Sequence, residues 1–343
     1  MDIEDYDPIS TLKVDENIIT KSKYPFIDVH NHQFDMPLKD LTQLVKEMDS
    51  LNMAFMINLS GFRGVYFDKS MQNINDNYPD RFGLFVNIDF EKIDDENFAK
   101  NNTELIRNAV GDGAMGLKIY KSLGLDDKDK YGNRIKINDP RLKPIWEICG
   151  QLKIPVLIHS GDPESFWKPK DKLNERWLEL KQKPGRYRDP NKNPSFNEVL
   201  KEQHDMFKKN PNTTFINAHL GWIGNDLDRL SNHLDNNNNV ITEIGAVLAE
   251  LGRQPRRARK FMIDYQDRIL FGKDSYKVSE YYTYFRVLET DDEYFNYYRK
   301  RHGNWKIYGL SLPDSVLKKV YYENALNLFP NLKENNFFKN LNE

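Results

Sequence analysis

Near the N-terminus stands the segment Phe26-Ile27-Asp28-Val29-His30-Asn31-His32, an apolar run that ends in two histidines. A short apolar run of this kind predicts a buried β-strand. Because successive side chains of a strand point to opposite faces, residues 30 and 32 face the same side. A lone histidine here would be an ordinary polar residue, but a His-x-His pair at a strand end indicates a metal site.

Three later segments repeat this arrangement. Ile154–Gly161 ends its apolar run in His159, Thr214–Gly221 ends in His219, and Ile269–Ser275 ends in Asp274. Four of the seven histidines thus lie at strand ends, and we expect the other three, His204, His233 and His302, to be structural or solvent-exposed. Three imidazoles and a carboxylate suit one divalent ion, Zn²⁺ or Mn²⁺, with a coordination position left open.

The strand pattern predicts the fold. Apolar runs alternate with stretches of helical period, which is typical of βα units around a parallel sheet. The eight expected strands are residues 26–30, 53–59, 82–88, 115–119, 156–159, 214–219, 240–244 and 268–271. Eight such units predict an α/β fold, a (β/α)8 TIM barrel, whose catalytic groups gather at the carboxyl ends of the strands.

We expect a polar N-terminal arm at residues 1–24, one catalytic barrel domain at 25–335 and a tail at 336–343. Extended loops follow strand five, at 160–194, and strand eight, at 275–312, and long loops are often functional. The second loop is rich in aromatic residues, which could form a lid over the site or a small core that fastens the loop: Tyr281, Tyr282, Tyr284, Phe285, Tyr294, Phe295, Tyr297, Tyr298, Trp305 and Tyr308.

The composition excludes several classes of protein. With 50 basic and 52 acidic residues the formal net charge is −2, so nothing draws the whole chain to nucleic acid or to an anionic membrane. The single cysteine, Cys149, excludes an internal disulfide framework and a cysteine-based zinc cluster. Residues 1–23 lack a signal-peptide pattern, which favours the cytoplasm, although a chain whose leader was removed would look the same and would be periplasmic.

The order His-x-His, His, His, Asp at strands one, five, six and eight resembles the amidohydrolase superfamily. Within it, the chain is similar to the amidohydrolase-related (type 2) branch, through the segments Asp28–His32, Gly116-Leu117-Lys118, the His219 segment and Tyr322-Glu323-Asn324-Ala325. The resemblance covers nearly the whole chain and implies a metal-dependent TIM-barrel enzyme. That branch includes lactonases, decarboxylases and hydratases, so membership defines the site better than the reaction.

Carried over by residue, the resemblance makes His30, His32, His159 and Asp274 the metal ligands. His219 becomes either a further ligand or a general acid/base. In hydrolytic members the aspartate at the position of Asp274 also takes a proton from the water that the ion activates.

Lys118 ends strand four, where binuclear members of the superfamily carry a carbamylated lysine between two ions. The one-metal branch is the closer match, and there we expect Lys118 to meet a substrate carboxylate or to donate a proton. We therefore expect one metal ion.

Four further residues are candidates for substrate binding. Glu243, on strand seven, either points into the site or pairs with a lysine. Arg253 and Arg256 belong to a short basic cluster suited to carboxylates, although a solvated helix face would look similar. Trp222, just after His219, completes the set.

The leading functional hypothesis is a hydrolase that opens an ester or lactone-type C–O bond in a small carboxylated substrate, such as a sugar acid or a saccharide with uronic acid units. The alternative is a lyase that uses the same site, either a dehydratase on a uronic acid or a decarboxylase. A non-catalytic binding barrel is a third class, but it would be expected to have lost a ligand. The sequence leaves open whether the chain forms a homo-oligomer.

Overall fold

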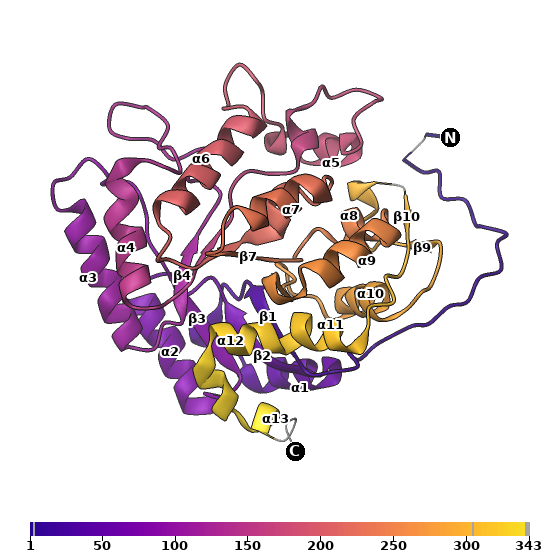
Figure 1. Cartoon of the computed structure of the whole chain (residues 1–343), viewed down its shortest axis with the longest axis horizontal. Helices are drawn as coiled ribbons and strands as arrows, with labels where there is room; N and C mark the ends of the chain where they lie inside the picture. The colour runs from indigo at the N-terminus through magenta and orange to yellow at the C-terminus, as the bar shows by residue number, and fades with distance from the viewer. Residues whose placement is uncertain (3, 304, 340–343) are drawn as a thin grey trace.

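The computed structural model describes residues 1–2, 4–303 and 305–339, and it shows eight parallel strands arranged in chain order as a barrel (Figure 1). The strands are β1 Phe26–Asn31, β2 Met53–Asn58, β3 Phe82–Asn87, β4 Gly116–Ile119, β5 Val156–Ile158, β6 Phe215–Asn217, β7 Val240–Glu243 and β8 Ile269–Leu270. Every predicted strand is present, and the TIM-barrel prediction is confirmed. Several predicted strands are too long at their carboxyl ends, so that His159 and His219 lie just beyond β5 and β6.

The barrel closes between its last and first strands. The backbone N–H of Val29 donates to the carbonyl of Phe271 at 3.0 Å, and Asn31 and Asp274 form an isolated parallel bridge. The N–H of Asp274 donates to the carbonyl of His30 at 2.6 Å. These contacts hold two predicted metal ligands, one on each strand end, next to each other.

Helices surround the strands (Figure 1). They are α1 Leu41–Leu51, α2 Val65–Asn77, α3 Phe98–Gly111, α4 Lys143–Gln151, α5 Trp177–Gln182, α6 Phe196–Lys209, α7 Leu227–Asp235, α8 Leu248–Gly252, α9 Pro255–Asp264, α10 Val278–Glu289, α11 Asp314–Lys318, α12 Asn324–Leu328 and α13 Asn336–Lys339. A π-helical turn, η8 Lys319–Glu323, joins α11 to α12. No helix in the described part of the chain is long and apolar enough to cross a membrane.

Short 3-10 helices complete the connections: η1 Met36–Leu38, η2 Pro140–Leu142, η3 Glu164–Trp167, η4 Pro184–Arg186, η5 Ala218–Trp222, η6 Gln266–Arg268, η7 Lys300–His302 and η9 Pro330–Glu334. The start of α6 shows how local sequence sets an element boundary. The Ser195 hydroxyl accepts a hydrogen bond from the N–H of Glu198 at 3.1 Å, which satisfies one of the free donors of the first turn.

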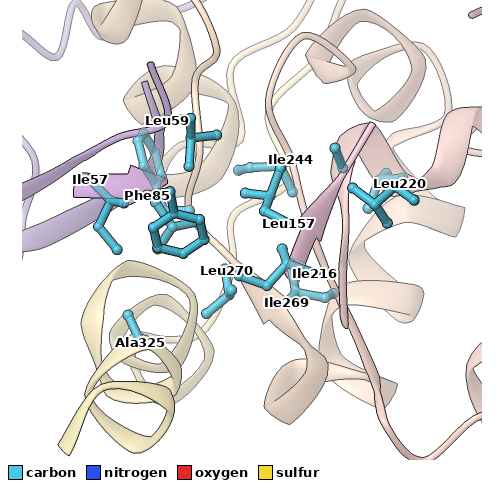
Figure 2. Close-up of a cluster of buried hydrophobic side chains, with 14 of the residues drawn as sticks. Ile57, Leu59, Phe85, Leu157, Ile216, Leu220, Ile244, Ile269, Leu270 and Ala325 are labelled. Atoms are coloured by element: carbon cyan, nitrogen blue, oxygen red, sulfur yellow. The ribbon is translucent and has the colours of Figure 1, made fainter. Parts of the chain in front are cut away.

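Apolar side chains from opposite strands meet inside the fold (Figure 2). The cluster is drawn from β2, β3, β5, β6 and β8, with further members from η5 and α12, and its labelled side chains are buried: Ile57, Leu59, Phe85, Leu157, Ile216, Leu220, Ile244, Ile269, Leu270 and Ala325. A packed interior of this kind makes the strand ends a rigid platform.

The two long loops contain structure of their own. The loop after β5 carries η3, α5 and η4, and the loop after β8 carries α10 and a small hairpin, β9 Phe295–Asn296 and β10 Lys306–Ile307. The aromatic residues of α10 pack inward: Tyr281, Tyr284 and Phe285 have no exposed surface. Burial of these three favours the small-core interpretation over the lid.

The predicted arm has neither helix nor strand in its described residues, 1–2 and 4–24, and it is tied down locally, since the N–H of Asn17 donates to Asp292 Oδ2 at 2.7 Å. The predicted tail differs from the expectation at its start, because 336–339 form α13 and Phe338 is buried. Positions 340–343 lie outside the described residues.

Candidate metal centre

Four of the predicted side chains meet at the carboxyl ends of the strands. Donor atoms of His30, His219 and Asp274 all lie within 4.8 Å of one another. Nε2 of His30 and Nε2 of His32 are each 3.6 Å from Oδ1 of Asp274. The structure thus brings together imidazoles from β1 and from the segment after β6 with the carboxylate after β8.

The backbone is unusual where two of these groups are held. His219, Leu220 and Gly221 adopt positive φ angles of 59°, 53° and 62°, and Asp274 has φ of 80°. Left-handed conformations are unfavourable for residues other than glycine and tend to occur at functional sites. The segment after β6 therefore turns sharply, which directs the His219 ring toward the centre of the barrel mouth.

Glu243, at the end of β7, binds the ring of His30 and the backbone of His219. Its Oε1 lies 2.9 Å from Nδ1 of His30 and accepts a 2.6 Å hydrogen bond from the N–H of His219. Nδ1 of His219 lies 2.8 Å from the carbonyl oxygen of Gly245, which can only accept. Both imidazoles therefore carry their proton on Nδ1, which leaves the Nε2 lone pair free for a metal ion.

The free nitrogens supply a test of whether the residues fit a metal ion. Nε2 of His30 and Nε2 of His219 are buried and have no hydrogen-bond partner among the described residues. Buried polar atoms are normally paired, so orphaned lone pairs beside an aspartate require an explanation. A divalent cation bound by nitrogen and oxygen donors would satisfy them, and this donor set therefore fits one.

His32 is held by a chain of hydroxyl groups. Its Nδ1 lies 2.7 Å from Oγ of Ser60, and Oγ of Ser60 is 3.1 Å from the hydroxyl of Tyr120. Ser60 and Tyr120 follow β2 and β4, and the sequence analysis did not identify them because it counted only histidines and charged groups at strand ends. The rule that strand-end residues line the site would have found both.

His159 occupies a different position from the other three histidines. Its ring lies 4.5 Å, centroid to centroid, from that of His219, but its Nε2 accepts a hydrogen bond from Nε1 of Trp222 at 3.2 Å. The indole N–H can only donate, so this nitrogen is engaged. The role of His159 as a ligand stays a prediction.

Lys118, on β4, is fully buried, and its Nζ has no hydrogen-bond partner among the described residues. Burial lowers the pKa of Lys118 to about 8, although the charges of Asp274 and Glu243 act in the opposite direction.

Burial also lowers the pKa of His32 to about 4, and the Lys118 charge contributes to that lowering. The histidine is therefore neutral at pH 7, as a metal ligand must be.

Asp274 responds to the same charges. Burial alone would raise its pKa, but His30, His219, His32 and Lys118 outweigh that effect and lower the pKa of Asp274 to about 2. The side chain remains 32% exposed. A carboxylate that is ionised at neutral pH and reachable from solvent can bind a metal ion or accept a proton.

Beneath the cluster, Asp28 is a buried support that the sequence analysis did not single out. Its Oδ1 accepts from the N–H of His30 at 3.1 Å, and its Oδ2 accepts from the Tyr281 hydroxyl at 2.6 Å. Burial raises the pKa of Asp28 to about 6. Tyr281 of helix α10 thus helps to hold Asp28, and Asp28 in turn helps to hold the backbone of His30.

In the part of the chain that the structure describes, the two candidate arginines, Arg253 and Arg256, make no hydrogen bond or ion pair with the histidine and aspartate cluster. Arg253 pairs with Glu175 of the β5 loop, with 2.9 Å between Nη1 and Oε2, and its guanidinium lies over the Trp305 ring. Arg256 is exposed on α9, and within the described chain no hydrogen bond or ion pair links it to the cluster. The structure therefore does not bring either guanidinium to the candidate ligands, and a role for them in substrate binding stays a prediction.

Comparison with known proteins agrees with this description. The amidohydrolase family profile matches residues 16–330. The fold is similar to that of an uncharacterised TIM-barrel protein from Bordetella bronchiseptica, with a TM-score of 0.57, 14% identity and coverage of 90% of this chain and 100% of that one. No match was found among curated proteins.

Two enzymes have similar folds. One is 2,6-dihydroxybenzoate decarboxylase from Rhizobium, with a TM-score of 0.55, 14% identity and coverage of 90% of this chain and 99% of that one. The other is 4-oxalomesaconate hydratase from Rhodopseudomonas palustris, with a TM-score of 0.54, 13% identity and coverage of 90% and 96%. At these identities the likeness concerns the fold.

Fold and site together define a class: a (β/α)8-barrel enzyme with a candidate site for a divalent metal ion at the strand ends. The chain belongs to the amidohydrolase family, in the amidohydrolase-related (type 2) branch that its sequence indicated. The members of that family are typically metal-dependent, in agreement with the His/Asp cluster found here.

Proposed function

We propose that this enzyme is a metal-dependent hydrolase that opens an ester or lactone-type C–O bond in a small carboxylated substrate, a sugar acid or a saccharide with uronic acid units. One observation carries the proposal: Asp274 Oδ1 lies 3.6 Å from Nε2 of both His30 and His32, and the unpartnered cation of Lys118, on β4, acts on the charge of Asp274. A base, a set of metal donors and a binding group for a carboxylate are then available in one place.

His30, His32 and Asp274 would hold one divalent ion, Zn²⁺ or Mn²⁺. His159 and His219 compete for the remaining position. The resemblance to the family favours His159, whereas the free Nε2 favours His219. When bound, the ion would polarise the carbonyl of the substrate and acidify a water molecule.

The residues of the chain have separate tasks in this proposal. Asp274 is ionised at neutral pH and accepts the proton of the attacking water. Lys118 pairs with the substrate carboxylate, and the buried surroundings strengthen that pairing. Whichever of His159 and His219 is not a ligand takes that proton from Asp274 on its Nε2 and passes it to the departing oxygen.

A lyase is the second candidate, and Lys118 favours it specifically. With its pKa lowered to about 8, Lys118 is close to the range in which a group exchanges protons efficiently at neutral pH. A dehydratase or a decarboxylase would use that property to move a proton next to a polarised carboxylate.

The test is to measure metal content by elemental analysis and then activity on lactones, uronate esters and uronic acid oligosaccharides. We expect about one equivalent of zinc or manganese and release of acid without new ultraviolet absorbance. A new C=C chromophore or release of CO₂ would replace the hydrolase by the lyase. No bound metal would refute both.

Two single substitutions assign the histidines. A ligand change, His159→Ala or His219→Ala, should abolish metal binding, whereas a change of the proton donor should leave metal content intact and lower kcat by about 10²- to 10⁴-fold. His204→Ala, on α6 outside the cluster, is the control for the loss of an imidazole.

A further inference from the structure

A groove runs between the loop after β5 and the loop after β8. One part of it has a volume of about 600 Å³ and is lined by Lys172, Trp177, Lys300 and Trp305, among others. A second hollow of about 520 Å³ shares its lining residues 173–175 with the first. In Figure 1, α5, α8 and the β9–β10 hairpin lie on the same side of the molecule.

One end of the groove lies at Trp222, which neighbours His159 of the candidate metal centre. A narrow hollow lined by Trp222, Ser165 and Glu175 shares the last two residues with the 520 Å³ hollow. Trp222 is also the residue whose Nε1 donates to His159. A ligand whose reacting end lies at the metal centre could therefore extend past Trp222 into the groove.

Two tryptophans of the groove are held by cations. The guanidinium of Arg253 lies 4.8 Å from the centre of the Trp305 ring, and Nζ of Lys181 lies 5.1 Å from that of Trp177. Trp305 nevertheless remains 45% exposed. Indole rings held in this way present flat apolar surfaces with a polar edge, which suit the faces of ring-shaped ligands such as sugars.

The β5-loop wall is preformed. Arg176 is buried and binds Oε2 of Glu179 at 3.0 Å and Oε1 of Glu250 at 2.5 Å. The side-chain amide of Asn174 donates to three backbone carbonyls of the same loop, those of Ser165, Lys168 and Pro169. A wall fixed by these bonds loses little freedom when a ligand binds, which favours affinity.

The charges of the groove are unbalanced. Around the 600 Å³ hollow the two acidic residues are already paired, Glu175 with Arg253 and Glu4 with Lys181, whereas Asp171, which lines the 520 Å³ hollow, makes no ion pair within the described chain. Lys172 is exposed and makes no ion pair within the described chain, whereas Lys300 has a distant contact with Asp7 at 3.6 Å. The excess of positive charge is thus confined to the 600 Å³ hollow, and there it favours an anionic ligand.

We propose that this groove binds the non-reacting part of an extended acidic oligosaccharide. The sugar rings stack on Trp177 and Trp305, and a carboxylate of the saccharide pairs with Lys172. The inference rests on the proposed function for the position of the reacting end, and it extends that function from small acids to oligomers.

The test is isothermal titration of the zinc-loaded full chain with trigalacturonate, with neutral maltotriose as the probe of matched length. We expect trigalacturonate to bind at least ten-fold more tightly than maltotriose and to change the tryptophan fluorescence. Trp305→Ala and Lys172→Glu should each weaken trigalacturonate binding about ten-fold or more. Lys172→Glu alters only an exposed side chain, so it tests the groove even if Trp305→Ala disturbs the fold, and Lys100→Glu on α3 is its control.

The same titration on Asp274→Ala separates this inference from the proposed hydrolase. Trigalacturonate that binds, together with no turnover of a small galacturonate ester or lactone by the wild type, would support the groove and contradict the hydrolase. Turnover of a small galacturonate ester, together with trigalacturonate binding no tighter than maltotriose or unchanged by Trp305→Ala and Lys172→Glu, would overturn the groove and leave the hydrolase standing.

Discussion

The carboxylate of Glu243 and the imidazole of His30 are joined by a fully buried hydrogen bond of 2.9 Å between Oε1 and Nδ1. Glu243 was expected either to point into the site or to pair with a lysine, and its carboxylate instead orients histidines. Because the same oxygen accepts from the N–H of His219, one side chain on β7 sets the positions of donors from β1 and from the segment after β6.

Glu243→Gln should weaken metal binding about 10- to 100-fold, the usual effect of losing a group that orients a metal ligand. The amide keeps one acceptor for His30 but loses the negative charge, and it cannot accept from the N–H of Gly245 with its nitrogen. Affinity is measured by competition with a chelator. Glu104→Gln, exposed on α3, is the control, and equal affinities in the two variants would contradict the role given to Glu243.

Gly272→Ala should disturb the centre although residue 272 is not a proposed ligand. A Cβ there would lie 2.5 Å from Oε2 of Glu243 and 2.9 Å from Cβ of His30, so both must move. We expect weaker metal binding and a loss of about 1–3 kcal/mol in the free energy of unfolding. At Gly111, on α3, a Cβ meets nothing within 4 Å, so Gly111→Ala should leave metal binding unchanged and should not lower the free energy of unfolding, since alanine favours a helix more than glycine does. Normal metal affinity in Gly272→Ala would argue against the tight packing around Glu243.

Lys118→Met should leave about one equivalent of metal bound and raise KM for a carboxylated substrate about ten-fold or more, because a charge-assisted hydrogen bond contributes about 1.5–3 kcal/mol. An uncharged ester analogue of the substrate, which cannot pair with the lysine, should keep its KM. Metal content and KM are measured on the same preparations. Two equivalents in the wild type and one in the variant would instead identify Lys118 as a carbamylated bridge.

Acid should destabilise the protein partly through His233. The His204 and His233 rings stack 3.7 Å apart between α6 and α7, and burial lowers the pKa of His233 to about 3. Since the folded pKa lies below the unfolded value of about 6.5, the stability contributed by the neutral imidazole is complete above pH 6.5 and is lost as the pH falls toward 3.

The measurement is the free energy of unfolding of wild type and His233→Leu at pH 7 and pH 4.5. The loss between these values should be smaller in the variant by on the order of 2 kcal/mol. Equal losses would show that His233 is protonated as easily in the folded protein as in the unfolded chain. Tyr131→Ala, at an exposed loop position, controls for a general effect of substitution.

The alternation of apolar runs with helical stretches was sufficient to predict the barrel, since both periodicities are local properties of the chain. The same reasoning placed His30 and His32 on one side of a strand. The closeness of Asp274 to both also followed, because the ends of parallel barrel strands share one face.

The remaining features depend on contacts between residues distant in sequence. The pairing of Glu243 with His30, the engagement of His159 by Trp222 and the support of Asp28 by Tyr281 each join segments whose distance is set by packing and by the sharp turn at His219. The sequence of the short basic cluster did not indicate where its side chains point. In the folded chain Arg253 contacts Glu175 and Trp305, outside the metal centre. Local sequence determines which side chains lie at the mouth of the barrel. Which of their atoms form hydrogen bonds is determined only when the barrel closes, because closure sets the distances between residues that are far apart in the sequence.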